Sequence, residues 1–267
     1  MTRFNACANN VKYARNVTTD ALESFLKCRM DVLTKNQILS VFHYAPLHYL
    51  PFIGRSQRLL GKQALAEAGF PEVHCRSSSA KQDIRRGFAN YVHLALDAHP
   101  PILGSKLSAG FPHFELKIPT SAVEQAGFHL CRFNIAKTRY FRGASREPSE
   151  CAENGRYYDG MLIPIAQTQK ERLVLFDANY GKNMIEVLVP GRLDLPGTTV
   201  ITVFDPEDER IANAVFRTLG LKWQIERANY QGHYTRRVQY VKQVSEFIER
   251  ALADTDWKGN GLDFDRV

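Results

Sequence analysis

The chain has 267 residues, of which 44% are hydrophobic, and a formal net charge of +7. This length suits one large globular domain with its own core, and the basic charge favours phosphate-rich partners. No apolar run approaches the roughly 18 residues that a membrane-spanning helix needs, and the first residues lack the apolar core of a signal peptide, so we expect a cytoplasmic protein with no membrane contact. The five cysteines include no CxxC pair, which argues against structural zinc and against a disulfide framework.

Taken in chain order, the apolar patterns and turn residues predict a mixture of helices and strands. The first element is a helix over residues 19–40, with Thr19 or Asp20 as its N-cap. The elements expected after it are a strand at 40–44, helices at 46–55 and 61–69, strands at 91–96 and 114–119, a helix at 120–127, strands at 128–135, 184–190 and 198–204, and helices at 206–220 and 235–253. The segment 141–160 is polar and rich in turn-forming residues, which makes it the best candidate for a mobile substrate loop. Because strands and short helices do not alternate regularly, the sequence predicts an α+β fold.

Glu186 is the residue that points most directly to chemistry, because it interrupts the apolar strand predicted at 184–190. On periodicity alone, such a glutamate faces solvent on the polar side of the strand. The alternative is a carboxylate that a rigid strand holds at the mouth of a cleft, where it acts on a ligand. The residues of this strand leave both interpretations open.

Four segments in a fixed order carry a family resemblance. They are FHYAPLHYLPFIGRSQRLLGK at 42–62, ANYVHLALDAHPPIL at 89–103, RYFRGAS at 139–145 and MIEVLVPG at 184–191. Together they resemble the DarT family of DNA ADP-ribosyltransferase toxins over about residues 41–215. The chain departs from the family pattern at Ala45, at Tyr49 and at His93-Leu94, and is therefore identified as a divergent member.

The resemblance implies an ADP-ribosyltransferase fold in which two small sheets form an NAD cleft with helices around it. It divides the chain into an N-terminal helical extension at 1–40 and a catalytic domain at 41–267. NAD is then a substrate, and no metal is expected. Glu186 matches the catalytic glutamate of the family, which holds the ribose 2′-hydroxyl and stabilises the positive charge that develops as nicotinamide departs.

The resemblance also implies contacts with NAD from the first and second strands and from the polar stretch between them. An arginine is expected to hold the NAD diphosphate or to orient the base, because its guanidinium fork matches a phosphate group. Arg86 is the preferred candidate and is expected to be the second catalytic residue beside Glu186. His43 is equally compatible with a hydrogen-bonded core histidine. The residues expected to bind NAD are His43, Tyr44, Arg76, Arg85 and Tyr91.

The acceptor is expected to be single-stranded DNA or an extruded base, because a base reacts only when its edge is exposed. Charge for phosphates and rings for stacking would come from Arg142, Arg146, Arg156, Tyr157 and Tyr158. The resemblance further implies a toxin of a toxin–antitoxin or anti-phage system, with a cognate antitoxin as partner.

Three alternatives remain open at this stage. The same chemistry could act on RNA, since no dedicated reader of the 2′-hydroxyl separates the two nucleic acids. The chain could be a nucleic-acid-binding module without activity, although the intact Glu186 argues against this. It could also use NAD with a protein acceptor or hydrolyse NAD alone. The sequence contains no GxGxxG, GxxxxGK[ST], HExxH or GxSxG motif, so dehydrogenase, NTPase, zincin and hydrolase classes have little support.

Overall fold

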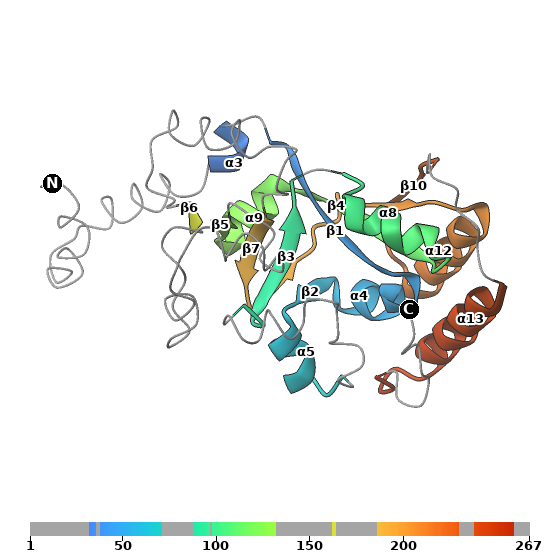
Figure 1. Ribbon diagram of the computed structural model, residues 1–267. Coiled ribbons are helices and arrows are strands. Elements are labelled where there is room, and N and C mark those ends of the chain that lie inside the picture. The colour runs from blue at the N-terminus through green and yellow to red at the C-terminus, as the bar shows by residue number, and fades with distance from the viewer. Residues whose placement is uncertain are drawn as a thin grey trace, which may run out of the picture.

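The computed structural model (Figure 1) describes residues 32–35, 38–70, 88–96, 98–131, 162–163, 186–229 and 238–258. Its strands form one eight-stranded sheet and one two-stranded sheet, so the predicted α+β class is confirmed. The strands are β1 Ser40–Pro46, β2 Arg58–Leu60, β3 Tyr91–Ala95, β4 His113–Pro119, β5 His129–Cys131, β6 Leu162–Ile163, β7 Glu186–Pro190, β8 Arg192–Asp194, β9 Val200–Val203 and β10 Gln224–Arg227.

The large sheet has the order β10-β9-β4-β1-β3-β7-β5-β6, and β2 pairs with β8 in the small sheet. Neighbouring strands run antiparallel except β9 and β10, which are parallel. The pair β1–β4 is in register from Ser40 opposite Pro119 to Pro46 opposite His113, and β3–β7 is in register from Tyr91 opposite Pro190 to Ala95 opposite Glu186. By contrast, β1 and β3 are paired only at Phe42 and Ala95.

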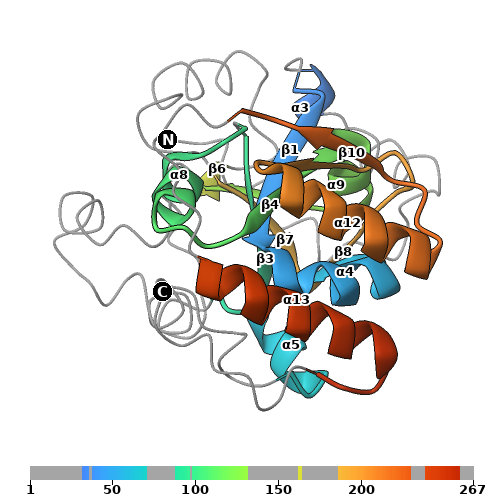
Figure 2. The same cartoon turned by 90° about the vertical axis from the view of Figure 1, so that its right-hand side faces the viewer.

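Helices surround the large sheet. They are α3 Val32–Lys35, the 3-10 helix η2 Leu47–Tyr49, α4 Leu50–Ser56, α5 Lys62–Glu67, α8 Pro101–Ser108, α9 Thr120–Ala126, α12 Pro206–Leu219 and α13 Val238–Ala253. Figure 2 shows α4, α12 and α13 side by side on one side of the sheet. Among the residues that the structure describes, no helix has both the length and the apolar character to cross a membrane.

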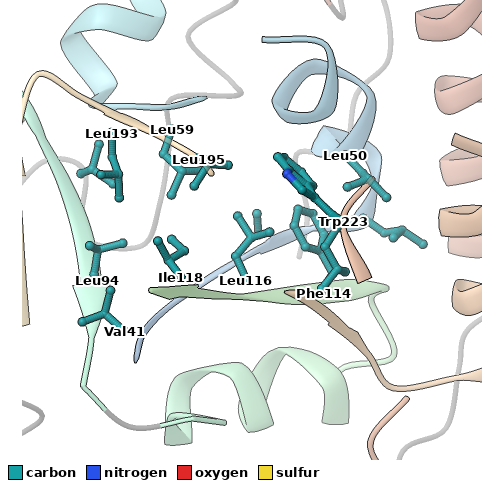
Figure 3. Packing of buried hydrophobic residues seen from close by; sticks show 14 of the residues in the cluster. Val41, Leu50, Leu59, Leu94, Phe114, Leu116, Ile118, Leu193, Leu195 and Trp223 are labelled. Atoms are coloured by element: carbon teal, nitrogen blue, oxygen red, sulfur yellow. The ribbon is translucent and has the colours of Figure 1, made fainter. Parts of the chain in front are cut away.

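The main core lies between that helical layer and one face of the sheet. Successive side chains of a strand point to opposite faces, and Phe114, Leu116 and Ile118 of β4 all project to the same side, where they are fully buried (Figure 3). Leu50 of α4 and Ile211 of α12 belong to the same apolar cluster. Burial of these side chains, at about 1.5–3 kcal/mol each, fixes the register of the strands and hence the position of every residue on the opposite face.

The opposite face is covered in part by α8. Leu103 and Leu107 of this helix are buried, and they cluster with Phe204 and with the half-buried Tyr44 of β1. Alternation along the strands places Tyr44, Glu115, His93 and Glu186 on this second face. The polar residues of the sheet are therefore gathered on the side away from the main core.

Several expected elements are confirmed almost to the residue. The helix expected at 206–220 is α12, whose N-cap Asp205 accepts a hydrogen bond from the Glu207 N–H at 2.8 Å. It ends at Gly220, which has the left-handed φ of 66° that favours glycine. The strands expected at 91–96 and 114–119 are β3 and β4.

Other expectations are wrong or incomplete. The helix expected at 19–40 cannot reach its predicted end, because Ile38 and Leu39 are not helical and Ser40 begins β1. The α-helix expected at 46–55 starts only at Leu50, after a 3-10 turn. The strands β2, β6, β8 and β10 and the helix α8 were not expected at all.

The described part of the segment at 1–40 is joined to the main domain. The carboxylate of Glu124 in α9 accepts hydrogen bonds from the main-chain N–H groups of Leu33 and Thr34 at 2.9 and 3.0 Å. It also accepts one from the Thr34 hydroxyl at 2.9 Å. Leu33 is fully buried in the main core, so α3 shares this core even though residues 1–40 were expected to form a separate extension. The division of the chain into two parts stays a prediction.

Candidate active site

Glu186 opens β7, a strand in the interior of the large sheet. It lies opposite Ala95 of β3 on one side and opposite Cys131 of β5 on the other. The next three residues, 187–189, are buried, so the strand that carries the carboxylate is held firmly on both sides. The Glu186 side chain is only 12% exposed, whereas a glutamate on a solvated strand face would be largely open to water. The structure therefore favours a carboxylate held in a sheltered position.

His93 of β3 is a neighbour of this carboxylate. Its Nδ1 lies 3.6 Å from Oε2 of Glu186, and its side chain is 21% exposed. The two residues are diagonal neighbours on the same face, since His93 pairs with Leu188 and Glu186 with Ala95. The other ring nitrogen, Nε2, lies 3.3 Å from the carbonyl oxygen of Phe88. Sequence reasoning missed His93, although an imidazole inside the apolar run YVHLAL was a usable signal.

His43 of β1 is joined to the main chain of His93. Its Nδ1–H donates to the main-chain carbonyl of His93 at 3.0 Å, at the point where the single pairing of Phe42 with Ala95 is all that joins β1 to β3. Burial lowers the pKa of His43, as does the nearby His93 imidazole, while the hydrogen bond to the carbonyl acts in the opposite direction. His43 is thus a hydrogen-bonded, neutral-favouring histidine, and because it pairs with Leu116 of the core face, alternation places its side chain on the face of the sheet opposite to Glu186.

The two tyrosines expected to bind NAD occupy different places. Tyr44 packs against the α8 cluster described above. Tyr91 is 8% exposed and its ring lies 5.8 Å from that of Phe88. Tyr91 is also four residues along β3 from Ala95, the partner of Glu186, which is about 13 Å at the usual rise per strand residue. Tyr91 therefore cannot touch the same atoms as Glu186, and the NAD contacts of both tyrosines stay predictions.

A second carboxylate, Glu115 of β4, lies on the same face but serves another contact. It is 1% exposed, and burial raises its pKa to about 7 while a hydrogen bond from His99 acts against this. The His99 N–H donates to Oε2 at 2.7 Å and its Nδ1 lies 3.2 Å from Oε1. His99 has a positive φ of 52°, a conformation that few non-glycine residues adopt. Since β1 and β3 separate β4 from β7, three strand spacings, about 14 Å across the sheet, lie between Glu115 and Glu186. Glu115 therefore holds the turn before α8 and does not form a carboxylate pair with Glu186.

A hollow of about 500 Å³ lies elsewhere, on the outer end of the sheet. Its walls come from α12, from β10 and from the connection between them. The residues that line it are Glu209, Asn213, Phe216, Arg217, Gly220, Leu221, Trp223 and Ile225. It is not next to Glu186, because β9, β4, β1 and β3 lie between β10 and β7. Within the described ranges, no group of three or more His, Cys, Asp or Glu side chains is arranged to hold a metal ion.

Comparison with known proteins gives structural likeness without sequence likeness. No protein-family model matches the chain, and no curated protein has a matching sequence. The structure of DarT from Thermus sp. 2.9 in complex with ADP-ribosylated single-stranded DNA is similar, with a TM-score of 0.46 and 16% identity over 74% of this chain and 97% of that chain. The same protein in complex with NAD+ gives a TM-score of 0.44 and 14% identity over 72% and 98%. At these identities an activity has to be argued from the side chains themselves.

The remaining expected site residues lie outside the described residues. They are Arg76, Arg85 and Arg86 of the stretch before β3, and Arg142, Arg146, Arg156, Tyr157 and Tyr158 of the long polar loop. Their roles stay predictions. The structure thus places the His93 ring in contact with Glu186, joins His43 to the main chain of His93, and places Tyr44 and Tyr91 along the two strands that carry the histidines.

Proposed function

We propose that this protein is an ADP-ribosyltransferase that moves ADP-ribose from NAD to a base of single-stranded DNA, with Glu186 as the catalytic carboxylate. The observation that carries the proposal is the sheltered position of Glu186, 12% exposed on an interior strand and 3.6 Å from His93. Glu186 is also the residue whose sequence motif matches the catalytic glutamate of the family that the sequence resembles. A glutamate on a solvated surface would have neither this low exposure nor a close histidine contact, and both features are typical of functional sites.

The chemistry requires one bond to break and one to form at the same carbon. The bond from ribose C1′ to the nicotinamide nitrogen breaks, and its electron pair leaves on nicotinamide, which becomes neutral. A base nitrogen then bonds to C1′ and releases its proton. Glu186 would accept a hydrogen bond from the ribose 2′-hydroxyl and place its negative charge beside the oxocarbenium-like centre, where a preorganised charge stabilises the transition state.

We place the nicotinamide end of NAD where β1 and β3 part. Phe42 and Ala95 form the pair that the described sheet shows between these strands. Glu186 lies opposite Ala95 on the other side of β3, and His43 donates to the main-chain carbonyl of His93. The diphosphate would then be held by an arginine from the stretch before β3, with Arg86 preferred over Arg76 and Arg85. Guanidinium groups suit this role because their planar fork matches a phosphate.

The proposal of single-stranded DNA as the acceptor rests on the net charge of the protein and on the accessibility of the base. A net charge of +7 favours a polyanion, and a base inside a duplex cannot present its edge to a buried carboxylate. The loop residues Arg142, Arg146, Arg156, Tyr157 and Tyr158 would supply phosphate contacts and stacking. Because base modification damages the DNA of the cell that makes the protein, we propose a toxin with a cognate antitoxin.

The experiment that tests the proposal is an adduct screen. The purified protein is incubated with NAD and with single-stranded DNA or RNA oligonucleotides that each contain one reactive base type, and mass spectrometry detects an ADP-ribose adduct. An adduct on DNA supports the proposal. An adduct on RNA alone overturns the DNA acceptor, and nicotinamide release without any adduct replaces the transferase with an NAD hydrolase.

A further inference from the structure

We propose that His93 is a positioning residue that acts through Glu186: its imidazolium ring contacts the Glu186 carboxylate and fixes its orientation. The inference rests on the proposed function for its catalytic consequence, but the contact itself is a property of the fold. Three distances describe the contacts of His93. Nδ1 lies 3.6 Å from Glu186 Oε2, Nε2 lies 3.3 Å from the Phe88 carbonyl oxygen, and the His93 carbonyl accepts the His43 Nδ1–H at 3.0 Å.

The partners of the ring decide where its protons are. The Phe88 carbonyl can only accept, so Nε2 must carry a hydrogen. If the ring were neutral, Nδ1 would then present a lone pair to a carboxylate oxygen, which is repulsive. A hydrogen on both nitrogens makes both contacts attractive, and a carboxylate within about 4–6 Å favours that charged form. The geometry therefore assigns an imidazolium to His93.

The surroundings make this charge pair effective. Both side chains are mostly sheltered from water, at 21% and 12% exposure, so their attraction is screened less than on an open surface. Phe88 is 2% exposed, and its carbonyl, which also accepts the Tyr91 main-chain N–H at 3.2 Å, lies on the far side of the ring. The distance of 3.6 Å is that of a charge contact and is longer than a hydrogen bond, and contacts of this kind tighten when a ligand closes the site.

Other titratable groups sit on the strands around β3. His43 and Tyr44 lie on β1, and the Cα of Cys131 on β5 lies opposite Glu186. Arg192 and Asp194 lie on β8 and Arg58 on β2, toward the Tyr91 end of β3. Among the described residues, the Glu186 carboxylate lies 3.6 Å from the His93 ring, and this pair lies toward the Ala95 end of β3, where Phe42 of β1 pairs with that strand.

The matched variants are His93→Leu, which removes both ring nitrogens at similar volume, and His93→Gln, which keeps a neutral N–H donor. The control is His99→Gln, which removes an imidazole from a different carboxylate, Glu115, on the same sheet face. Loss of a partner that orients a functional side chain costs about 10–100-fold in activity at metal sites, and a misplacement of about 1 Å costs about 100-fold at other sites. We expect kcat to fall by about this factor in His93→Leu, with His93→Gln between it and the wild type, while KM for NAD stays the same.

A spectroscopic readout tests the contact without any activity. In protein labelled with 15N-histidine, the His93 ring of the wild type at pH 7 should show the signature of two protonated nitrogens, and Glu186→Gln should convert it to a neutral ring with the proton on Nε2. Resonances are assigned by their loss in His93→Gln. This measurement remains decisive where His93→Leu fails to fold.

The outcomes are separable from those of the proposed function. An unchanged kcat in folded His93→Leu, or a neutral His93 ring in the wild type, overturns the inference and leaves the ADP-ribosyltransferase proposal standing. Absence of every adduct and of nicotinamide release from the wild type, with the imidazolium signature present, overturns the proposed function and with it the catalytic role of His93.

Discussion

Glu115 should make the protein lose stability as the pH rises, and Glu115→Gln should remove that loss. Burial raises the pKa of Glu115 to about 7, whereas the same group in the unfolded chain has the ordinary value of 4.5. Between these values the folded protein binds a proton that the unfolded chain has released, so the free energy of unfolding falls as pH rises. The contribution is complete below pH 4.5 and is lost as the pH passes about 7. At about 1.4 kcal/mol per pKa unit, the difference amounts to about 3 kcal/mol.

The wild-type protein alone will not show this dependence, because His113 acts in the opposite direction. Burial lowers the pKa of His113 from 6.5 to about 4, with the hydrogen bond from its Nδ1 to the Phe111 carbonyl acting against this. A lowered pKa means that its contribution is present above 6.5 and is lost as the pH falls to about 4. The two slopes largely cancel where their ranges overlap.

The assay is therefore a comparison of urea unfolding curves for the wild type and Glu115→Gln at several pH values across this range. Glutamine can still accept the His99 N–H through its carbonyl oxygen, so the variant changes charge more than contacts. The wild type should lose about 3 kcal/mol relative to the variant between pH 4.5 and 7. Parallel stability profiles for the two proteins would refute the reasoning, and Glu226→Gln on the exposed part of β10 serves as the control for a solvated glutamate.

Three further predictions concern the fold and the acceptor. Asp205→Ala should destabilise the protein by about 1 kcal/mol in urea unfolding, because it removes the cap that accepts the Glu207 N–H at 2.8 Å. Gly61→Ala should cost about 1–3 kcal/mol, because its Cβ would lie 2.8 Å from the main-chain carbon of Asn90, whereas Gly197→Ala, whose Cβ meets nothing within 4 Å, should be close to neutral; equal effects would contradict the packing. Binding to single-stranded DNA, followed by fluorescence anisotropy, should weaken steeply with salt as counterions are released, and a flat response would argue against a nucleic-acid acceptor.

Where local signals were strong, the sequence predicted the fold well. The helix α12 begins with Asp205 and Pro206 and ends at Gly220, and each of these residues has one conformational preference that marks a helix end. The strand expected at 114–119 is β4. Its alternation of side chains is a local signal that can be recognised without knowing the partner strand.

The elements that were missed have little local signal. The strands β2 and β8 are three residues long, and they pair Arg58 with Asp194 across a large sequence separation. Such short strands have too few residues for a recognisable alternation of side chains. The helix α8 follows Pro100 and Pro101, which suggest a turn, although Pro101 occupies a first helical position where a missing N–H costs nothing.

The candidate site shows the same division. Glu186 emerged from an ordered set of motifs, but a sequence cannot tell whether a strand glutamate is solvated or sheltered. His93 escaped notice because its contact with Glu186 depends on the diagonal register of β3 and β7. The burial of Glu115 could not be predicted from the sequence, because it results from tertiary packing. The second face of β4 is covered by the turn that carries His99 and by α8.

The role of Glu186 is tested most directly in a single-turnover reaction with NAD and the oligonucleotide that accepts ADP-ribose. Glu186→Gln keeps the shape of the side chain and removes its charge, and Glu226→Gln removes a charge from an exposed strand position. The proposal predicts that Glu186→Gln slows adduct formation by about 100-fold or more, the usual effect of losing one transition-state stabilising group, while its Kd for NAD and the activity of Glu226→Gln are unchanged. A Glu186→Gln protein that forms the adduct at the wild-type rate would contradict it.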